Sequence, residues 1–467
     1  MNTDSSNGSA LGSLEALIDT LPPDSKLPSY RELQQRYRVS PATIQRMLAG
    51  LARRGLLITK PGSGTFTAAR RAARPAADLS WQTLALGSRA GLGPDLERLL
   101  DELAPDAIGM ASGFPDPGLQ PLGLLAAAAS RASRRPQAWN RLPAQGLPEL
   151  RTYLADEAGG GLTAANVLIS SGGQSSLSAV FRHLCAPGDP LIVESPTYVG
   201  ALAAARAAGL RLVPVPGDEH GVLPDVLADA FARTGARLAY LQPRYANPAG
   251  TLLAPDRRGP VLAAVARAGA FLLEDDWMRD FDLGAPSPPP LISEDDDGHV
   301  IYLRSVSKPI AAGLRICGIA ARGPVLSRLR RGRISDDLFV APVLQQIAVD
   351  VLTAPGWPRH LAGVRRQLRE RRDALVAAIS AQLPSARLEL VPAGGVHLWL
   401  RLPEQCSDSD VSDAALSRGV AVYPGRPCYP GEAPGSFLRL SFAGEQAPAL
   451  RRGVQVLAEV IEARPAC

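Results

Sequence analysis

The feature that most limits the fold of this chain is a series of short apolar runs separated by helix-like segments. Each run has the length of one strand, and the runs occupy residues 166–170, 190–195, 237–243, 270–276 and 300–307. Strands that alternate with helices favour a mostly parallel sheet covered by helices on both faces. Later patterns predict two helices, three strands and a closing helix at 341–353, 358–383, 387–391, 395–402, 436–442 and 446–463. We therefore expect a large α/β domain followed by a smaller α+β one.

Length and composition indicate several domains in a soluble chain. A chain of 467 residues is too long for one compact core and predicts two to four domains. Its 46% hydrophobic and 20% charged residues are ordinary for globular proteins.

Five scattered cysteines without a CxxC pair favour a reducing compartment over a disulfide framework, and we expect no metal site. The polar segment MNTDSSNGSA and the lack of a bilayer-length apolar run lead us to expect a cytoplasmic protein that does not enter a membrane.

Positive charge is concentrated at the front of the chain. The first 75 residues contain 11 lysines and arginines against five acidic residues, whereas the net charge of the whole chain is only +5. A basic segment ahead of a nearly neutral body is typical of a module that binds an anionic partner such as DNA. A solvated basic tail would have the same charge, so charge alone leaves both interpretations open.

The pattern of residues 13–67 favours the DNA-binding interpretation. Ser29 with Glu32 forms a capping-box pattern that opens one helix, and Ser40 followed by Pro41 opens a second. Strand-like LLIT (56–59), the turn PGSG (61–64) and TFT (65–67) follow. An upstream amphipathic segment, 13–21, completes a three-helix core. Helix, tight turn, helix and hairpin predict a winged helix-turn-helix.

The stretch from LPSYREL to KPGSGTF resembles the DNA-binding domain of GntR-family bacterial regulators over nearly its whole length. The resemblance implies that double-stranded DNA is contacted by Arg31, Ser40, Thr43, Gln45, Arg46 and the wing around Gly62. Some relatives have arginine at the positions of Pro41 and Gln45, so their operator sequences are not carried over. The expected boundaries are a disordered N-terminus (1–12), the winged helix (13–68) and a linker (69–105).

Four motifs of the body follow predicted strands, where ligands of open α/β sheets bind. They are SGGQSS (171–176), YANPAG (245–250), LLEDDW (272–277) and SVSKPIAAGLR (305–315). Taken singly, each of these motifs also has a purely structural explanation. The glycines suit a turn, Asn-Pro is an ordinary turn, and the acids are typical helix caps. Lys308 is more informative, because the chain has only three lysines and the other two lie in the first sixty residues. An amine that loses its proton can form an imine, whereas a guanidinium stays protonated and cannot.

In this order and spacing, the motifs resemble the site of fold-type I pyridoxal-phosphate (PLP) enzymes over residues 106–463. The resemblance implies a large part at about 125–355 and a small part at 106–124 and 356–463. It implies Lys308 as the aldimine lysine and Asp275 as the partner of the pyridine nitrogen. The other cofactor-binding residues that it implies are Gly172, Gly173, Gln174, Tyr198, Asn247, Trp277, Ser305 and Arg315. Arg439 would bind the carboxylate of a substrate or effector.

The whole arrangement resembles the MocR/GabR-like transcriptional regulators. This implies a homodimer, head to tail and with exchanged DNA-binding domains, that senses an amino compound or PLP through an aldimine. Trp277 departs from the tyrosine that relatives usually have, which favours sensing over turnover. An active PLP-dependent aminotransferase and a sensor of PLP alone are the two alternatives.

Overall fold

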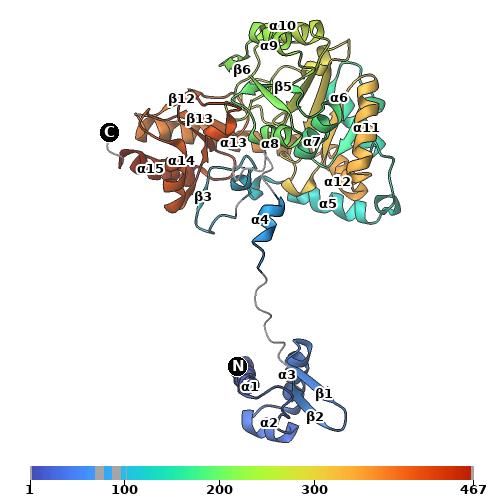
Figure 1. Ribbon diagram of the computed structural model, residues 1–467, viewed down its shortest axis with the longest axis vertical. Helices are drawn as coiled ribbons and strands as arrows, with labels where there is room; N and C mark the ends of the chain where they lie inside the picture. The colour runs from blue at the N-terminus through green and yellow to red at the C-terminus, as the bar shows by residue number, and fades with distance from the viewer. Residues whose placement is uncertain (1–2, 69–77, 87–95, 101, 464–467) are drawn as a thin grey trace. The chain divides into compact units, whose positions relative to one another are not determined.

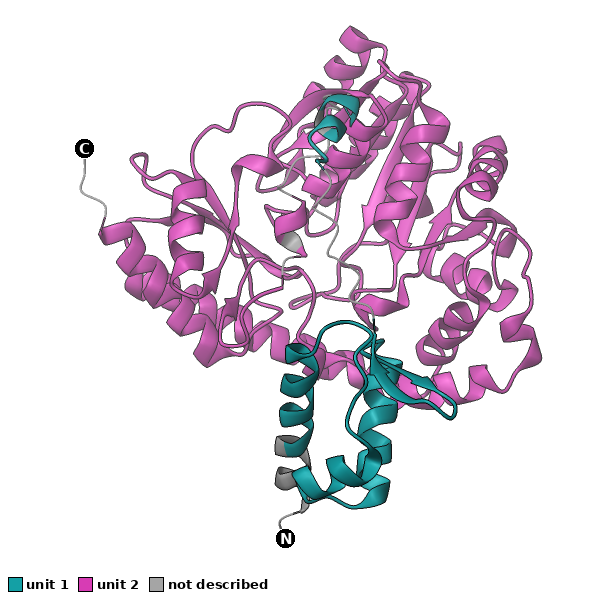
Figure 2. Ribbon diagram, turned by 60° about the horizontal axis from the view of Figure 1, so that its bottom comes forward, with its two compact units in different colours: residues 1–88 teal, residues 89–467 magenta. Residues whose placement is uncertain are grey.

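The computed structural model describes residues 3–68, 78–86, 96–100 and 102–463. The chain divides into two compact units, residues 1–88 and 89–467 (Figure 2). None of the helices within the described residues has the length and apolar character that a membrane span requires.

The first unit contains a three-helix core and a β-hairpin. Its elements are α1 (Thr3–Thr20), α2 (Tyr30–Tyr37), α3 (Pro41–Arg53), β1 (Leu57–Lys60), β2 (Gly64–Thr67) and α4 (Trp81–Leu86). Both expected helix caps are present: Ser29 and Glu32 form a capping box, and the Ser40 hydroxyl accepts from the Thr43 N–H. The expected winged helix-turn-helix is therefore the observed fold of residues 3–67.

The N-terminus differs from the expectation of disorder over residues 1–12. Helix α1 begins at Thr3, ten residues before the amphipathic segment that the sequence singled out. Ala10 lies one helical turn before Leu14 and is buried with Leu14 and Ile18 in the core of this unit. Leu11 also packs against this core, so the helix contributes apolar contacts ahead of the segment that the sequence indicated.

The second unit is built on an eight-stranded sheet with the strand order β4-β11-β10-β9-β8-β5-β6-β7. The strands are β4 (Val167–Ser170), β5 (Pro190–Ser195), β6 (Arg211–Asp218), β7 (Gly221–Val222), β8 (Leu238–Leu241), β9 (Phe271–Asp276), β10 (Val300–Ser305) and β11 (Cys317–Ala320). Strands β10, β9, β8, β5 and β6 are parallel, whereas β11 runs antiparallel to both of its neighbours. The expected mostly parallel sheet is thus observed.

Helices cover both faces of this sheet (Figure 1). One face carries α7 (Gly173–Leu184), α8 (Val199–Ala207) and α11 (Pro324–Asp337) over one buried apolar cluster. The opposite face carries α6 (Pro148–Ala158), α9 (Pro224–Thr234), α10 (Pro255–Arg267) and α12 (Pro342–Leu352) over a second cluster. Helix α5 (Leu122–Ser133) packs on α12. Short 3-10 turns are η1 (Glu97–Leu99), η2 (Pro117–Leu119), η3 (Pro136–Trp139), η4 (Ala164–Asn166), η5 (Leu291–Glu294), η6 (Ala312–Leu314) and η7 (Arg426–Cys428).

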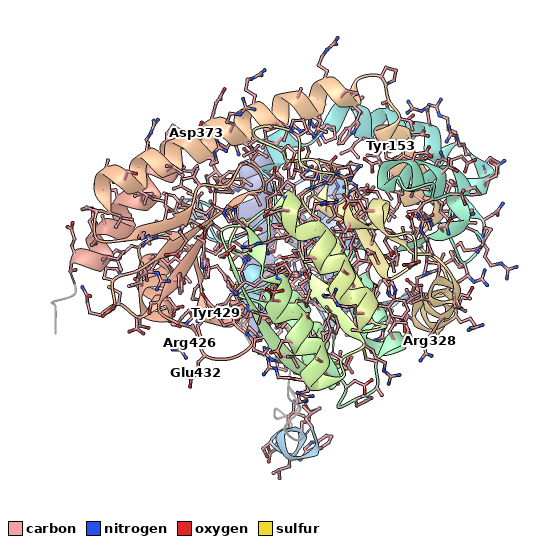
Figure 3. The ribbon with its side chains drawn as sticks, turned by 90° about the horizontal axis from the view of Figure 1, so that it is seen from above. Tyr153, Arg328, Asp373, Arg426, Tyr429 and Glu432 are labelled. Carbon is pink, nitrogen blue, oxygen red and sulfur yellow. The ribbon has the colours of Figure 1, made fainter. Side chains whose placement is uncertain are left out.

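A smaller antiparallel sheet with helices forms the C-terminal part of the second unit. Its strands β12 (Arg387–Leu390), β13 (His397–Arg401), β16 (Phe437–Ser441) and β15 (Tyr423–Pro424) lie side by side in this order. The helices are α13 (Trp357–Gln382), α14 (Asp408–Ser417) and α15 (Ala447–Glu462). Strand β3 (Ile108–Gly109) pairs with β14 (Val420–Ala421), so the segment that follows β3 is held against this part. In Figure 3 the long helix α13 carries the label Asp373, and the labelled Tyr429 belongs to an aromatic cluster with Trp399 and Phe437.

Candidate functional site

Six strands of the large sheet end at the same edge, because β4, β5, β6, β8, β9 and β10 all run in one direction. Gly172 follows β4 and Tyr198 follows β5. Asn247 follows β8, Asp275 is the penultimate residue of β9 and Lys308 follows β10. Parallel topology therefore brings the four sequence motifs to one edge of the sheet.

The amine of Lys308 lies in an aromatic environment. Its Nζ is 3.3 Å from the ring centroid of Phe114 and 5.8 Å from that of Trp277. Burial, together with the positive charges of Arg439 and Arg315, lowers the pKa of Lys308 from the usual 10.5 to about 7, against the opposing charge of Asp275. An appreciable fraction of this lysine is therefore a neutral amine, and hence a nucleophile, near neutral pH.

Asp275 is a buried carboxyl group held by two donors. The Tyr240 hydroxyl and Gln242 Nε2 donate to its Oδ2 at 2.8 and 2.9 Å. Burial raises the pKa of Asp275 to about 6, although these two hydrogen bonds lower it. Tyr240 and Gln242 escaped the sequence analysis, and their only signal was a polar group within an otherwise apolar strand pattern.

A candidate anion-binding cradle lies where β4 passes into α7. Gly172 is the N-cap of α7 with φ +97° and ψ 166°, and a Cβ there would lie 2.6 Å from Nη2 of Arg315. The missing side chain thus makes room for a guanidinium beside the free N–H groups of a helix N-terminus. Gly173 and Gln174 are the first residues of that helix. The Gln174 side chain is fixed, because its Oε1 accepts from the Tyr198 hydroxyl at 3.1 Å and its Nε2 donates to the Gly200 carbonyl at 2.7 Å.

The edge also contains buried hydroxyl groups without a hydrogen-bond partner among the described residues. They are Thr197 Oγ1, next to Tyr198, and Ser307 Oγ, next to Lys308. Ser305, the predicted phosphate ligand, is the last residue of β10. Unpaired buried polar groups require a partner, and here they accompany the cradle, the amine and the carboxyl group. The set fits a phosphorylated pyridine aldehyde such as PLP.

Arg439 links the small sheet to the strand-edge site. It is 1% exposed; its Nη1 donates to Asn247 Oδ1 at 3.0 Å and its Nη2 to the Ala111 carbonyl at 2.7 Å. Its guanidinium carbon lies 4.5 Å from the centroid of the Tyr423 ring. Its Nε has no hydrogen-bond partner among the described residues. The expected carboxylate-binding residue and the expected cofactor-binding amide are thus in direct contact.

The indole of Trp277 is oriented by the backbone. Its Nε1 donates to the Tyr245 carbonyl at 3.2 Å, so this N–H is already used. Its ring stacks on that of His397 with the centroids 5.4 Å apart. His397 stands at the start of the apolar strand HLWLR, and the sequence gives no sign of its place in the site.

The predicted DNA-contacting residues are distributed over the surface of the first unit. Arg31 lies in the first turn of α2, and Gly62 lies in the turn between β1 and β2 with φ +74°. The four other residues, Ser40, Thr43, Gln45 and Arg46, lie at the N-cap and in the first half of α3. All six except the half-buried Thr43 are exposed.

The sequence matches two families in agreement with these two units. Residues 105–457 match the aminotransferase class I and II family, and residues 10–67 match the gntR family of bacterial regulatory proteins. Relatives include the 2-aminoadipate transaminase of Thermus thermophilus, 32% identical over 77% of this chain and 91% of that protein. The uncharacterized HTH-type transcriptional regulator YdfD of Bacillus subtilis is 27% identical over 94% of this chain and 92% of its own.

Solved structures agree with the sequence relatives. LysN, the alpha-aminoadipate aminotransferase from Thermus thermophilus complexed with N-(5'-phosphopyridoxyl)-L-leucine, superimposes with a TM-score of 0.76 at 32% identity and covers 82% of this chain and 99% of its own. An archaeal alanine:glyoxylate aminotransferase gives 0.73 at 28% identity over 79% of this chain and 93% of its own. The chain therefore belongs to the aminotransferase class I and II family and joins that domain to a GntR winged helix, as the MocR-like regulators do.

Proposed function

We propose that the protein is a PLP-dependent, DNA-binding transcriptional regulator that senses an amino compound in its aminotransferase-like domain. One observation carries this proposal: a nucleophilic lysine with a cofactor cradle stands on the same chain as a complete winged helix. The pattern of relatives supports it, because the regulator YdfD matches 94% of the chain whereas the 2-aminoadipate transaminase matches 77%.

The described residues have separate tasks in holding the cofactor. PLP, when bound, supplies an aldehyde that captures amines and a ring that withdraws electrons. Lys308 would provide the amine that attaches it covalently, and Asp275, a carboxylate above a pH of about 6, would pair with its ring nitrogen. Arg315, Gly172 and the first N–H groups of α7 bind its phosphate.

The remaining residues would recognise the ligand and couple its binding to DNA binding. An amino compound would compete with Lys308 for the cofactor, and Arg439 would bind its carboxylate. We further propose a cytoplasmic homodimer, head to tail and with exchanged DNA-binding domains. Two winged helices would then contact two half-sites whose spacing follows the geometry of the dimer. A movement of the large part of the second unit relative to the small part would alter how the two winged helices are presented to DNA.

A working aminotransferase is the second candidate function, and the 32% identity to a transaminase supports it. Trp277 argues against efficient turnover, because its N–H is already held by the Tyr245 carbonyl. A regulator that responds to PLP alone is a third possibility. The response to an added amino compound distinguishes the three functions. An aminotransferase converts the compound repeatedly, an amine sensor shows a single shift of its PLP absorbance band, and a PLP sensor shows no response to amines.

The experiment is a titration of the purified protein with PLP and then with amino acids, following absorbance and DNA binding in parallel. We expect a PLP band that shifts with an amine and a DNA affinity that changes with it. Lys308→Ala should abolish covalent trapping of PLP by borohydride while leaving the fold and some DNA binding intact. Trapping in this variant would overturn the assignment of Lys308, and steady turnover with a keto acid would favour the aminotransferase.

A further inference from the structure

His397 lies beside Arg439 on one face of the small sheet. Strand β13 pairs with β16 so that His397 faces Ser441 and Trp399 faces Arg439. Side chains alternate along a strand, which places His397 and Trp399 on the same face as their partners Ser441 and Arg439. His397 and Arg439 are thus diagonal neighbours, a separation that long side chains bridge.

The imidazole of His397 is buried without a hydrogen bond. The residue is 4% exposed, and neither Nδ1 nor Nε2 has a hydrogen-bond partner among the described residues. Leaving a buried polar group unsatisfied costs about 1–3 kcal/mol. Packing alone would be served better by phenylalanine, because the ring already stacks on Trp277. The two polar nitrogens therefore require an explanation.

The surroundings of His397 are those of the ligand site. A Cβ on Gly113 would lie 2.9 Å from Nε2 of the imidazole, so only a glycine fits in the segment that passes over it. Burial and the positive charges of Arg439 and Lys308 keep the pKa of His397 well below its usual range. A neutral imidazole presents one N–H donor and one acceptor. Because the nearby charges are both positive, a ligand seated here is expected to be anionic.

Arg439 offers a second unused donor, because its Nε is also buried and unpartnered among the described residues. Two unpaired donors from neighbouring strands on one face form a seat for a single carboxylate group. We propose that His397 is a ligand-binding residue that donates an N–H to the carboxylate that Arg439 binds. The ligand is thereby an amino acid and not a simple amine. This inference rests on the proposed sensing function and specifies its ligand class.

The test compares pairs of probes that differ in the α-carboxylate. L-Alanine with ethylamine, and L-phenylalanine with 2-phenylethylamine, are titrated into the PLP-loaded protein while the absorbance of bound PLP is followed. We expect His397→Phe to weaken both amino acids by about 10- to 100-fold, the loss of one hydrogen bond to a charged group. Both amines should bind as they do to the unaltered protein. His397→Asn, which keeps an N–H donor, should recover part of the affinity for the amino acids.

Each outcome decides the inference. Equal binding of amino acids by His397→Phe and the unaltered protein overturns it, as does an equal loss for amino acids and amines. L-Serine tests the other use of the imidazole, since a loss confined to serine would mean that His397 reads a side chain and not the carboxylate. A failure of every amino acid to change the PLP band of the unaltered protein overturns the sensing function itself, and the inference with it. An unchanged PLP spectrum in His397→Phe verifies that the variant is folded.

Discussion

Gly172→Ala should weaken cofactor binding specifically, because it places a methyl group in the anion cradle. The new Cβ would lie 2.6 Å from Nη2 and 2.8 Å from Cζ of Arg315, closer than real Cβ contacts permit. Arg315 would have to move away from the phosphate site. The loss of one charge-assisted hydrogen bond, about 1.5–3 kcal/mol, corresponds to about a 10- to 100-fold rise in the Kd for PLP.

Backbone strain adds a cost that must be separated from this effect. Gly172 has φ +97° and ψ 166°, a region populated almost only by glycine, where another residue costs about 1–3 kcal/mol. Gly323 is a matched control: it is also a helix N-cap, has φ 76° and ψ −161°, and an added Cβ meets nothing within 4 Å. Both alanine variants should therefore lose a similar amount of stability in urea unfolding of the apo-protein.

The assay is an equilibrium titration with PLP followed by absorbance. We expect Gly172→Ala to bind PLP about 10- to 100-fold more weakly and Gly323→Ala to bind like the unaltered protein. Normal PLP affinity in Gly172→Ala would refute the cradle, since the clash with Arg315 would then have no consequence. An equal loss of affinity in both variants would attribute the effect to stability.

Three other predictions concern the amine, the indole and the DNA-binding surface. Because the pKa of Lys308 is lowered to about 7, the rate of PLP capture by the apo-protein should rise with pH through about 7 and then level off. The control is free Nα-acetyl-lysine, whose rate should keep rising to pH 10. A protein rate that also keeps rising to pH 10 contradicts the lowered pKa. Trp277→Tyr should lower the pH at which the bound PLP band titrates, since a phenol can donate to the cofactor oxygen while the indole N–H is held by a carbonyl; Trp277→Phe, which adds no donor, should leave that pH unchanged. Arg31→Ala should weaken DNA binding about 10-fold or more without changing the PLP spectrum, whereas Arg331→Ala, an exposed arginine of α11, should change neither; normal DNA binding by Arg31→Ala would refute the predicted interface.

The sequence predicted the elements that have a clear period or a clear cap. The five apolar runs of the large sheet are all strands, because buried parallel strands are continuous apolar segments. Strand β6 was missed because Pro214 and Pro216 interrupt its apolar pattern, and prolines demote a run to an edge or a loop. The prolines fit because the antiparallel β7 pairs with β6 only at Gly217 and Asp218, beyond both of them. Strand β11 was missed because four residues with a glycine give no signal of their own.

The candidate site shows the same division between local pattern and long-range packing. Lys308 and Asp275 could be singled out because amines and acids at strand ends have specific chemistry. The contact between Arg439 and Asn247 joins residues 192 positions apart, and no local pattern contains it. His397 lay hidden for a related reason: within an apolar strand its ring reads as one more core residue, and only the missing hydrogen bonds distinguish it.

The short stretch from Ala111 to Phe114 touches three parts of the ligand site at once. Its Ala111 carbonyl accepts from Arg439, Gly113 borders the His397 ring, and the Phe114 ring lies against the Lys308 amine. This stretch therefore occupies one donor of Arg439 and covers the Lys308 amine. A ligand that approaches this amine would have to displace the Phe114 ring from it. The affinity of such a ligand would therefore be a difference between the contacts that it gains and those that this stretch loses.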